Sequence, residues 1–316
     1  MTQTAPAPAG STQDDASKRL ARRQKALEAI FGGKFLHTFL SPYMVIEDHV
    51  IECPVGIRFY KKDFNYLSKQ LYLEYQYRSW RGFNAELLDK YATIITAKLA
   101  AIDTLMQNNI NRLQKLLDQQ GHKADLTLWP LVHKSDVPII AAQARAYIGV
   151  LQKMDRLYTL SGTANLLGVI DSAQRADVEF TAKKAVRAFR SILQTEVTRL
   201  YREAERIMKE QHQAGRVDVA MAAVVQEHGK DIAEFDKSSQ QEQDEDSTMD
   251  LGGADPSQVI ADATAASAAA AAAAGAGGAK KAPRAVKAKP EPMPQGGAEL
   301  VPASGAPAPA VSPAAA

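Results

Sequence analysis

The residue types that carry most enzyme and metal chemistry occur in this sequence, but their spacing does not assemble a site. The six histidines stand at none of the short spacings of zinc or metalloprotease motifs, and the single cysteine, Cys53, has no partner cysteine. Nucleophile elbows, Walker A motifs and dinucleotide-binding glycine patterns do not occur. Carboxylates on predicted helices, such as Glu74, Asp89, Asp103 and Asp155, have no pairing partner in the sequence. We therefore expect no enzyme activity, no metal and no cofactor.

A basic and aromatic stretch at residues 52–84 suggests a different chemistry, the recognition of nucleic acid. It reads ECPVGIRFYKKDFNYLSKQLYLEYQYRSWRGFN and holds six basic, three acidic and nine aromatic residues. Lysine and arginine neutralise DNA phosphates, and the planar arginine fork also matches a guanine edge. The alternative is an edge strand before a tyrosine-rich core helix, with solvated basic side chains.

The stretch divides into elements that would position these groups. Apolar residues alternate over residues 50–60, which predicts a half-buried strand with Ile51, Cys53, Val55, Ile57 and Phe59 on one face. Pro54 lacks an N–H and indicates an edge strand or a bulge. Asp63 is a good N-cap for a helix to about residue 80, which is apolar on two sides. A turn with Gly82 and Asn84 then precedes a long amphipathic helix over residues 85–120.

The rest of the folding unit is predicted to be helical. An amphipathic pattern indicates helices over residues 16–33, 139–161 and 172–213, with a weak last helix over 217–237. Residues 122–138 are predicted to be a loop. The fold class is therefore mainly α, with a strand–helix–helix core near residues 49–120 that is extended by long amphipathic helices.

Strand, helix, turn and helix in this order are what a ribbon–helix–helix DNA-binding module requires. Two subunits would each contribute one strand to a ribbon that lies in the major groove of double-stranded DNA. Arg58 and Tyr60 would face the bases, and Asn84 would cap the second helix beside a phosphate. The expected phosphate ligands are Lys61, Lys62, Arg78 and Arg81. The expected homodimer interface comprises Ile57, Phe59, Phe64, Leu67, Leu71 and Tyr75.

Two other basic faces have alternative interpretations. Lys18, Arg19, Arg22, Arg23 and Lys25 form either a solvated face or an arm that touches phosphate, and we favour the solvated face. Lys183, Arg187 and Arg190 share one helical face and form either a second DNA-binding surface or a solvated face. We again favour the solvated face.

Composition separates a folding unit from two tails. Residues 1–16 and 238–316 are rich in Ala, Pro, Gly and Ser, and we expect both to be disordered, with one domain over 17–237. Residues 1–237 carry 33 basic and 27 acidic side chains, a net charge of +6, which permits a polyanionic partner. The sequence has no apolar signal segment and no membrane-length apolar run, so a cytoplasmic protein without membrane contact is expected.

Part of the chain resembles a family of regulators. The segment KQLYLEYQYRSWRGFNAELLDKYATI, and a later one of the form Ala-x-x-Tyr-x-x-x-Leu-x-x-x-Asp-x-Leu, lead to a basic helix that ends in Val-Arg-Ala-Phe. They are similar to the AcaB-like regulators of conjugative plasmids and integrative conjugative elements, over about residues 51–192. The resemblance implies a transcriptional activator of transfer genes with a ribbon–helix–helix core. The alternative function is a non-enzymatic helical accessory protein of conjugation that binds protein partners.

Overall fold

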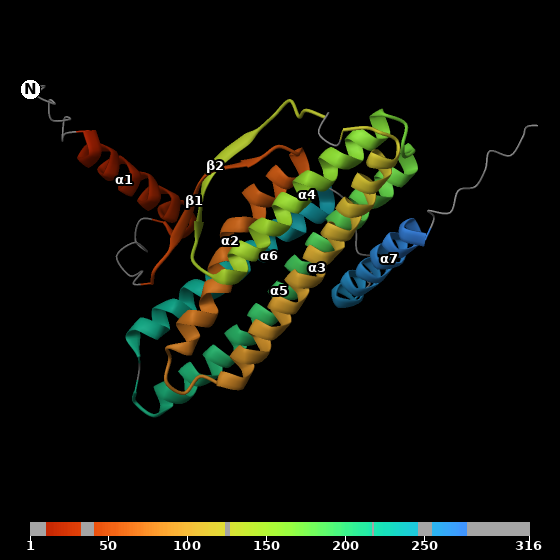
Figure 1. The fold of residues 1–316 in the computed structure, drawn as a ribbon. Helices are drawn as coiled ribbons and strands as arrows, with labels where there is room; N and C mark the ends of the chain where they lie inside the picture. Colours follow the sequence, from red (N-terminus) through yellow and green to blue (C-terminus); the bar gives the residue numbers. More distant parts are fainter. Residues whose placement is uncertain (1–10, 33–40, 124–126, 217, 246–254, 277–316) are drawn as a thin grey trace, which may run out of the picture. The chain divides into compact units, whose positions relative to one another are not determined.

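The computed structural model describes residues 11–32, 41–123, 127–216, 218–245 and 255–276, which all belong to one unit, Met1–Gly278 (Figure 1). The prediction of a mainly α fold, in which a strand is followed by two helices, is confirmed. The elements in chain order are α1 (Ser11–Phe31), β1 (Met44–Ile51), α2 (Pro54–Arg78), α3 (Ala85–Gln119), β2 (His133–Ile139), α4 (Ala142–Leu166), α5 (Ser172–Gln213), α6 (Val219–Glu245) and α7 (Pro256–Ala276).

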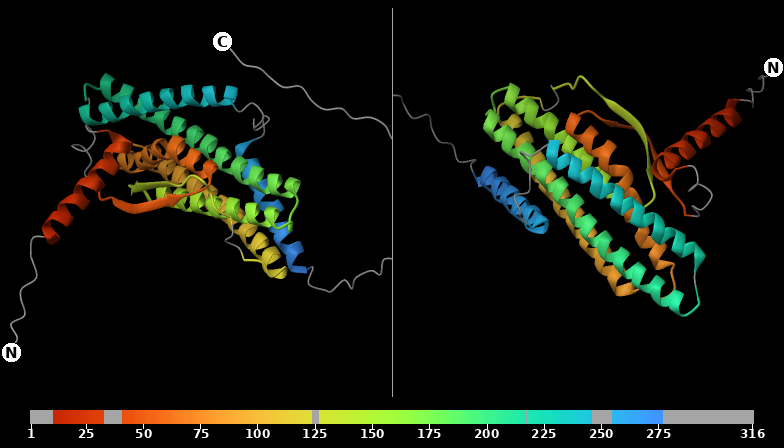
Figure 2. Two further views of the ribbon diagram at one scale, coloured as in Figure 1. Left: turned by 90° about the horizontal axis from the view of Figure 1, so that it is seen from above. Right: turned by 180° about the vertical axis from the view of Figure 1, so that it is seen from behind.

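Three long helices, α3, α4 and α5, form the centre of the core and lie side by side (Figures 1 and 2). Asn84 caps α3 as predicted, because its side chain accepts a hydrogen bond from the Leu87 amide at 3.2 Å. Asp171 begins α5 with a capping box that includes Gln174. The apolar stripe of α3 is buried along its whole length, from Leu88 to Leu117. Local caps and long amphipathic patterns thus place the core helices where the sequence predicted them.

The start of α2 corrects the predicted strand. Residues 54–60 are helical, so the prediction of a strand over residues 50–60 is wrong except at its first residues. Pro54 occupies the first helical position, where a missing N–H costs nothing. Cys53 is the N-cap, and its Sγ accepts a hydrogen bond from the Gly56 amide at 3.1 Å. Asp63, predicted as the N-cap, instead lies buried in the third turn of α2.

The two strands of the sheet belong to the same chain. β1 pairs antiparallel with β2, from Met44 opposite Ile139 to Ile51 opposite His133. The prediction of a loop over residues 122–138 is therefore wrong for β2. The register shifts between Ile46 and His49, where Asp48 adopts a positive φ of 56°. This bulge turns the Asp48 side chain toward α1.

Helical structure also extends into the segments predicted as disordered tails. α1 begins at Ser11, α6 continues to Glu245, and α7 spans Pro256–Ala276. α7 packs on α3 and α5 and buries Val259 and Ile260. The hydroxyl groups of Thr264 and Ser267 lie 3.5 and 3.4 Å from carbonyl oxygens of α3. These parts are helical in the structure, and the remainder of both tails lies outside the described residues.

Candidate nucleic-acid interface

The first turns of α2 are held by an aspartate from α4. Asp155 Oδ1 accepts hydrogen bonds from the backbone amides of Glu52 at 3.0 Å and Cys53 at 2.5 Å. A carboxylate at this position satisfies amides that would otherwise lack partners and opposes the positive end of the helix dipole. Burial raises the pKa of the Cys53 thiol well above its usual range, so this cysteine is an unreactive cap. The N-terminus of α2 is therefore occupied by the protein's own anion.

Three predicted phosphate or base ligands project from these first turns. Arg58, Lys61 and Lys62 are exposed on α2, so Arg58 lies on a helix and not on the predicted strand. Tyr60 is half-buried, and its ring stacks on Phe64 with centroids 5.3 Å apart and contacts His133. Burial raises the pKa of the Tyr60 hydroxyl. The structure therefore keeps the three basic side chains at the surface and places Tyr60 against the sheet.

The other predicted DNA ligands lie at the opposite end of α2. Arg78 forms ion pairs with Glu74 at 3.0 Å and Asp89 at 2.8 Å, Arg81 is exposed beside Gly82, and Asn84 caps α3. Twenty residues of helix separate Arg58 from Arg78, which corresponds to about 30 Å. The predicted set is thus divided between two distant surfaces.

The predicted dimer interface mostly lies inside the single chain. Phe59, Phe64, Leu67 and Leu71 are buried in its hydrophobic core. Ile57 is half-buried, whereas Tyr75 is 60% exposed and stacks on Tyr72. Because β1 finds its partner strand within the chain, edge pairing no longer requires a second subunit. The homodimer stays a prediction.

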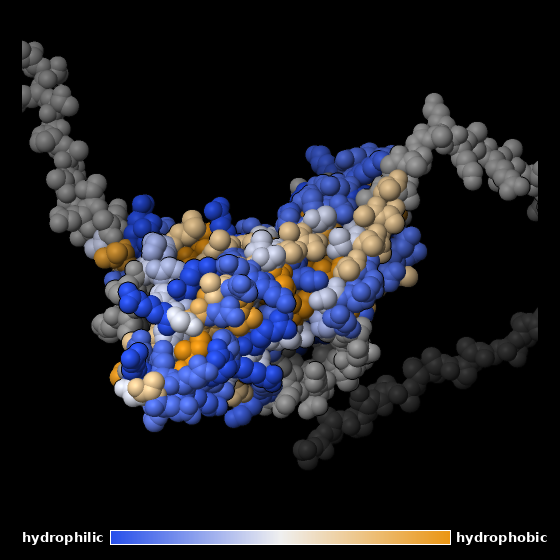
Figure 3. Space-filling model, turned by 90° about the horizontal axis from the view of Figure 1, so that it is seen from below, coloured by the Kyte–Doolittle hydropathy of each residue, from blue (hydrophilic) through white to orange (hydrophobic). Residues whose placement is uncertain are grey.

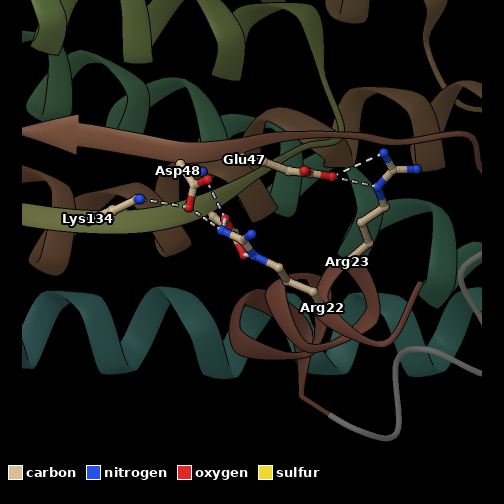
Figure 4. Close-up of polar contacts among 6 residues, drawn as sticks. Arg22, Arg23, Glu47, Asp48 and Lys134 are labelled. Carbon is tan, nitrogen blue, oxygen red and sulfur yellow. Dashed lines mark hydrogen bonds and ion pairs between the residues drawn. The ribbon is translucent and has the colours of Figure 1, made fainter. Parts of the chain in front are cut away.

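The outer face of the sheet carries acidic residues that bind α1. Arg22 forms ion pairs with Asp136 and with Asp48, the latter at 2.5 Å, and Arg23 pairs with Glu47 at 3.1 Å (Figure 4). The Arg22 guanidinium lowers the pKa of both Asp48 and Asp136, which favours their charged forms. The sequence pattern predicts Arg22 and Arg23 to be either solvated or in contact with phosphate. In the structure they instead form ion pairs with the sheet. A face with three carboxylates does not suit DNA phosphates.

A second helix contributes basic residues next to the start of α2. Asp63 of α2 pairs with Arg190 of α5 at 2.9 Å, and Tyr66 Oη donates to Gln194 Oε1 at 2.5 Å. These two contacts show that α2 and α5 run parallel in one register. One and two turns before Tyr66 on α2 lie Lys62 and Arg58, and about two and three turns before Gln194 on α5 lie Arg187 and Lys183, at the same end of the helix pair. We refer to these four residues together as the basic groove, a name for the set of side chains and not for a measured hollow.

Arg190 itself does not belong to this surface. Its side chain is 14% exposed, pairs with Asp63, and lies 4.2 Å from the ring centre of Phe235 of α6. The structure therefore divides the predicted face of α5. Arg190 holds α2, α5 and α6 together, whereas Lys183 and Arg187 are half-buried. The prediction of a surface role for Arg190 is wrong, because its helical position faces a neighbouring carboxylate.

Other sites offer less chemistry. Among the residues that the structure describes, no group of three or more His, Cys, Asp or Glu side chains can hold a metal ion. A pocket of about 710 Å³ lies at the C-terminal end of α5, where Arg206 is already paired with Glu203 and Glu210.

On the face in Figure 3, hydrophilic residues predominate and apolar residues form scattered patches. In the described ranges, no helix is both long and apolar enough to cross a membrane.

Comparisons with known proteins find one weak structural likeness. No family model matches the sequence, and no curated protein matches it. The crystal structure of selenomethionine-containing AcaB from uropathogenic E. coli superimposes with a TM-score of 0.46 and 17% sequence identity. The match covers 62% of this chain and 97% of that one.

Proposed function

We propose that this protein is a DNA-binding transcriptional regulator, an activator of conjugative transfer genes on a mobile element. The observations that support the proposal are the Asp63–Arg190 and Tyr66–Gln194 contacts, which set α2 and α5 parallel, and the exposure of Arg58 and Lys62. Together with Lys183 and Arg187 of α5, these residues make the basic groove that we propose. Lys61 is also exposed in the first turns of α2 and lies close enough to His133 of β2 to lower the pKa of that histidine. Clustered guanidinium and ammonium groups bind phosphates by releasing condensed counterions. The sequence resemblance to AcaB-like regulators supplies the proposed context of gene transfer.

The groove replaces the ribbon in this proposal. In this proposal phosphate contacts from α2 and α5 position the duplex, and Arg58 is exposed in the first turns of α2, where its side chain can reach a base edge. We propose that Arg58 contacts a base edge and that Lys61, Lys62, Lys183 and Arg187 contact phosphates. No catalytic step is part of this function, so we propose that the protein is not an enzyme.

The test measures binding of a fluorescent duplex of about 30 base pairs taken from upstream of the element's transfer genes, with a scrambled duplex beside it. Neutralising Arg58, Lys62 and Arg187 to Gln should weaken binding at low salt. The slope of log affinity against log salt should flatten by about 0.9 for each phosphate that is no longer neutralised. Arg58→Ala alone should reduce the preference for the specific duplex, whereas Lys61→Ala should weaken binding to both duplexes equally.

The matched control removes three charges elsewhere. Lys90, Lys209 and Lys230 are exposed on α3, α5 and α6, outside the groove, and their change to Gln lowers the net charge equally. If this control weakens binding as much as the groove variant, the protein attracts DNA through its overall charge and the groove proposal fails.

A second candidate function is a helical accessory protein that binds protein partners. It is favoured by exposed apolar side chains at Leu128 (88%), Leu131 (68%), Val132 (57%) and Leu166 (76%). Thr127 and Trp129 fix this segment on α4 through hydrogen bonds to Thr163 and Thr159. Apolar contacts survive high salt, whereas phosphate contacts weaken, so the salt dependence of complex formation separates the two functions.

A further inference from the structure

The beginning of β2 lies against the first turns of α2. His133 is the first residue of β2, and it pairs with Ile51, the last residue of β1, just before the chain enters α2. The half-buried His133 ring contacts the ring of Tyr60 on α2, with centroids 5.5 Å apart. An imidazole is therefore held beside the helical turns whose exposed basic side chains are the proposed DNA ligands.

The charged groups around His133 on the neighbouring elements offer it no anion. Lys61 follows Tyr60 on α2, and burial together with the Lys61 ammonium group lowers the pKa of the His133 imidazole. On β1, burial lowers the pKa of His49 and His133 lowers it further, whereas Asp155 of α4 raises it. Asp155 is not among the groups that shift the pKa of His133. At pH 7 the His133 ring is therefore largely neutral.

The strand that carries His133 uses its other charged groups elsewhere. Lys134 pairs with Asp48 of β1 at 3.2 Å, and Asp136 pairs with Arg22 of α1. Both contacts belong to the acidic face of the sheet that binds α1. The groups that influence His133 in the described part of the chain are thus the Lys61 ammonium and its own burial, and neither supplies a negative charge.

We propose that the beginning of β2 and the first turns of α2 form one phosphate subsite of the DNA-binding surface, in which His133 binds a backbone phosphate beside Lys61 and takes up a proton from solvent as it does so. The inference rests on the proposed function, since it adds a residue and a proton to the same surface. The phosphate supplies the negative charge that His133 lacks and offsets the repulsion by Lys61. The imidazolium then donates a charge-assisted hydrogen bond to a phosphate oxygen.

A proton taken up on binding makes the affinity rise as the pH falls. Phosphodiester groups stay ionised between pH 6 and 8, so the DNA itself contributes no proton. The free protein protonates His133 only below the usual histidine pKa of about 6.5, whereas a bound phosphate raises the pKa of this group. Affinity therefore rises as the pH falls through the pKa of the complex, by at most about tenfold per pH unit, and levels off below the pKa of the free protein.

The experiment compares four forms of the full chain by fluorescence anisotropy with the same duplex, at pH 6, 7 and 8 and fixed salt. Beside wild type, the test variant is His133→Asn, which keeps a polar side chain that does not titrate. A second variant, His133→Lys, carries the positive charge at all three pH values. The matched control is His212→Asn, which removes an exposed imidazole from the last turn of α5.

We expect wild type and His212→Asn to bind the duplex several-fold more tightly at pH 6 than at pH 8. His133→Asn should lose most of this dependence and match wild type at pH 8, and His133→Lys should bind tightly at every pH. Calorimetry at pH 7 in two buffers with different heats of ionisation should show more proton uptake by wild type than by His133→Asn. A purely structural role predicts weaker binding by His133→Asn at every pH, a lower Tm and unchanged proton uptake.

The outcomes distinguish the two proposals. If wild type binds and His133→Asn keeps the same pH dependence, the His133 subsite is refuted while the DNA-binding function stands. The same holds if His212→Asn alone loses the dependence, because the proton is then bound elsewhere. If wild type does not bind the duplex at any of the three pH values, both the function and the inference are overturned.

Discussion

His228 lies buried between α2, α5 and α6, where its ring contacts Tyr77 and Tyr201. Its Nδ1 lies 2.6 Å from the Tyr77 hydroxyl oxygen, and its Nε2 has no hydrogen-bond partner among the residues that the structure describes. A protonated imidazole would need a second acceptor here. Burial therefore lowers the pKa of His228 from 6.5 to about 3.

This histidine should make folding stability depend on pH. The unfolded chain takes up a proton on His228 near pH 6.5, whereas the folded chain does so only near pH 3. The stability contribution is complete above pH 6.5 and declines as the pH falls, by about 2 kcal/mol at pH 5. Urea unfolding at pH 7.5 and 5 measures this. His228→Asn should show a shallower dependence than wild type, and the exposed His212→Asn should not; equal dependence in all three proteins would contradict the prediction.

Gly56 sits where α2 begins against β1. A Cβ atom at this position would lie 2.9 Å from Ile51 Cγ2 and 3.0 Å from Cys53 Sγ. Gly56→Ala should therefore destabilise the fold by about 1–3 kcal/mol, because the buried cap must move. Gly149 of α4 is the control, since a Cβ there meets nothing within 4 Å. Gly149→Ala should be neutral or stabilise by up to about 1 kcal/mol in the same urea titration; equal effects of both changes would refute the steric account.

At the level of secondary-structure elements, ion pairs from one helix connect it to a distant sheet. Arg22 bridges Asp48 of β1 and Asp136 of β2, and Lys134 adds a contact to Asp48 at 3.2 Å. Leu27 and Ile30 of α1 are buried beneath this contact. α1 is therefore attached by a polar contact near its middle and an apolar contact near its end.

Arg22→Ala should loosen α1 without unfolding the core helices. Hydrogen exchange of amides in residues 17–30 should become several-fold faster, because the variant cannot bridge the two strands. Arg19→Ala, an exposed change on the same helix, is the control. High salt should accelerate exchange in wild type more than in the variant. Unchanged exchange in Arg22→Ala would mean that the apolar contact alone holds α1.

For the whole molecule, the alanine-rich α7 belongs to the folded unit. Small side chains allow close approach, and Ile260 is 1% exposed against α3 and α5. A chain that ends at residue 245 should lose about 2–4 kcal/mol of stability, since Val259 and Ile260 leave the core. A chain that ends at residue 276 keeps α7 and should match wild type in thermal unfolding. Equal stability of the two truncations would contradict the packing role of α7.

Helices α3, α4 and α5 could be predicted from the sequence because their signals are local. The Asn84 cap and apolar residues every three or four positions specify α3 within the segment that forms it. Arg58 was expected to be exposed on a strand, and Lys61 and Lys62 just past it; all three are exposed, on α2. The alternation over residues 50–60 also fits a helix that starts at Pro54, and a short apolar pattern does not separate the two.

The remaining features depend on contacts between distant residues. β2 follows a segment without strand periodicity and forms because β1, 88 residues away at the Asp48–Asp136 contact, offers it a paired edge. The sequence of α7 is low in complexity. Its few large apolar residues stabilise the helix only when they are buried against α3 and α5, because that burial offsets the conformational entropy lost on ordering. The proposed basic groove likewise combines residues from two distant segments, 58–62 and 183–187. The sequence shows that these residues are basic. The Asp63–Arg190 ion pair, which sets the register of α2 against α5, forms only when the chain packs.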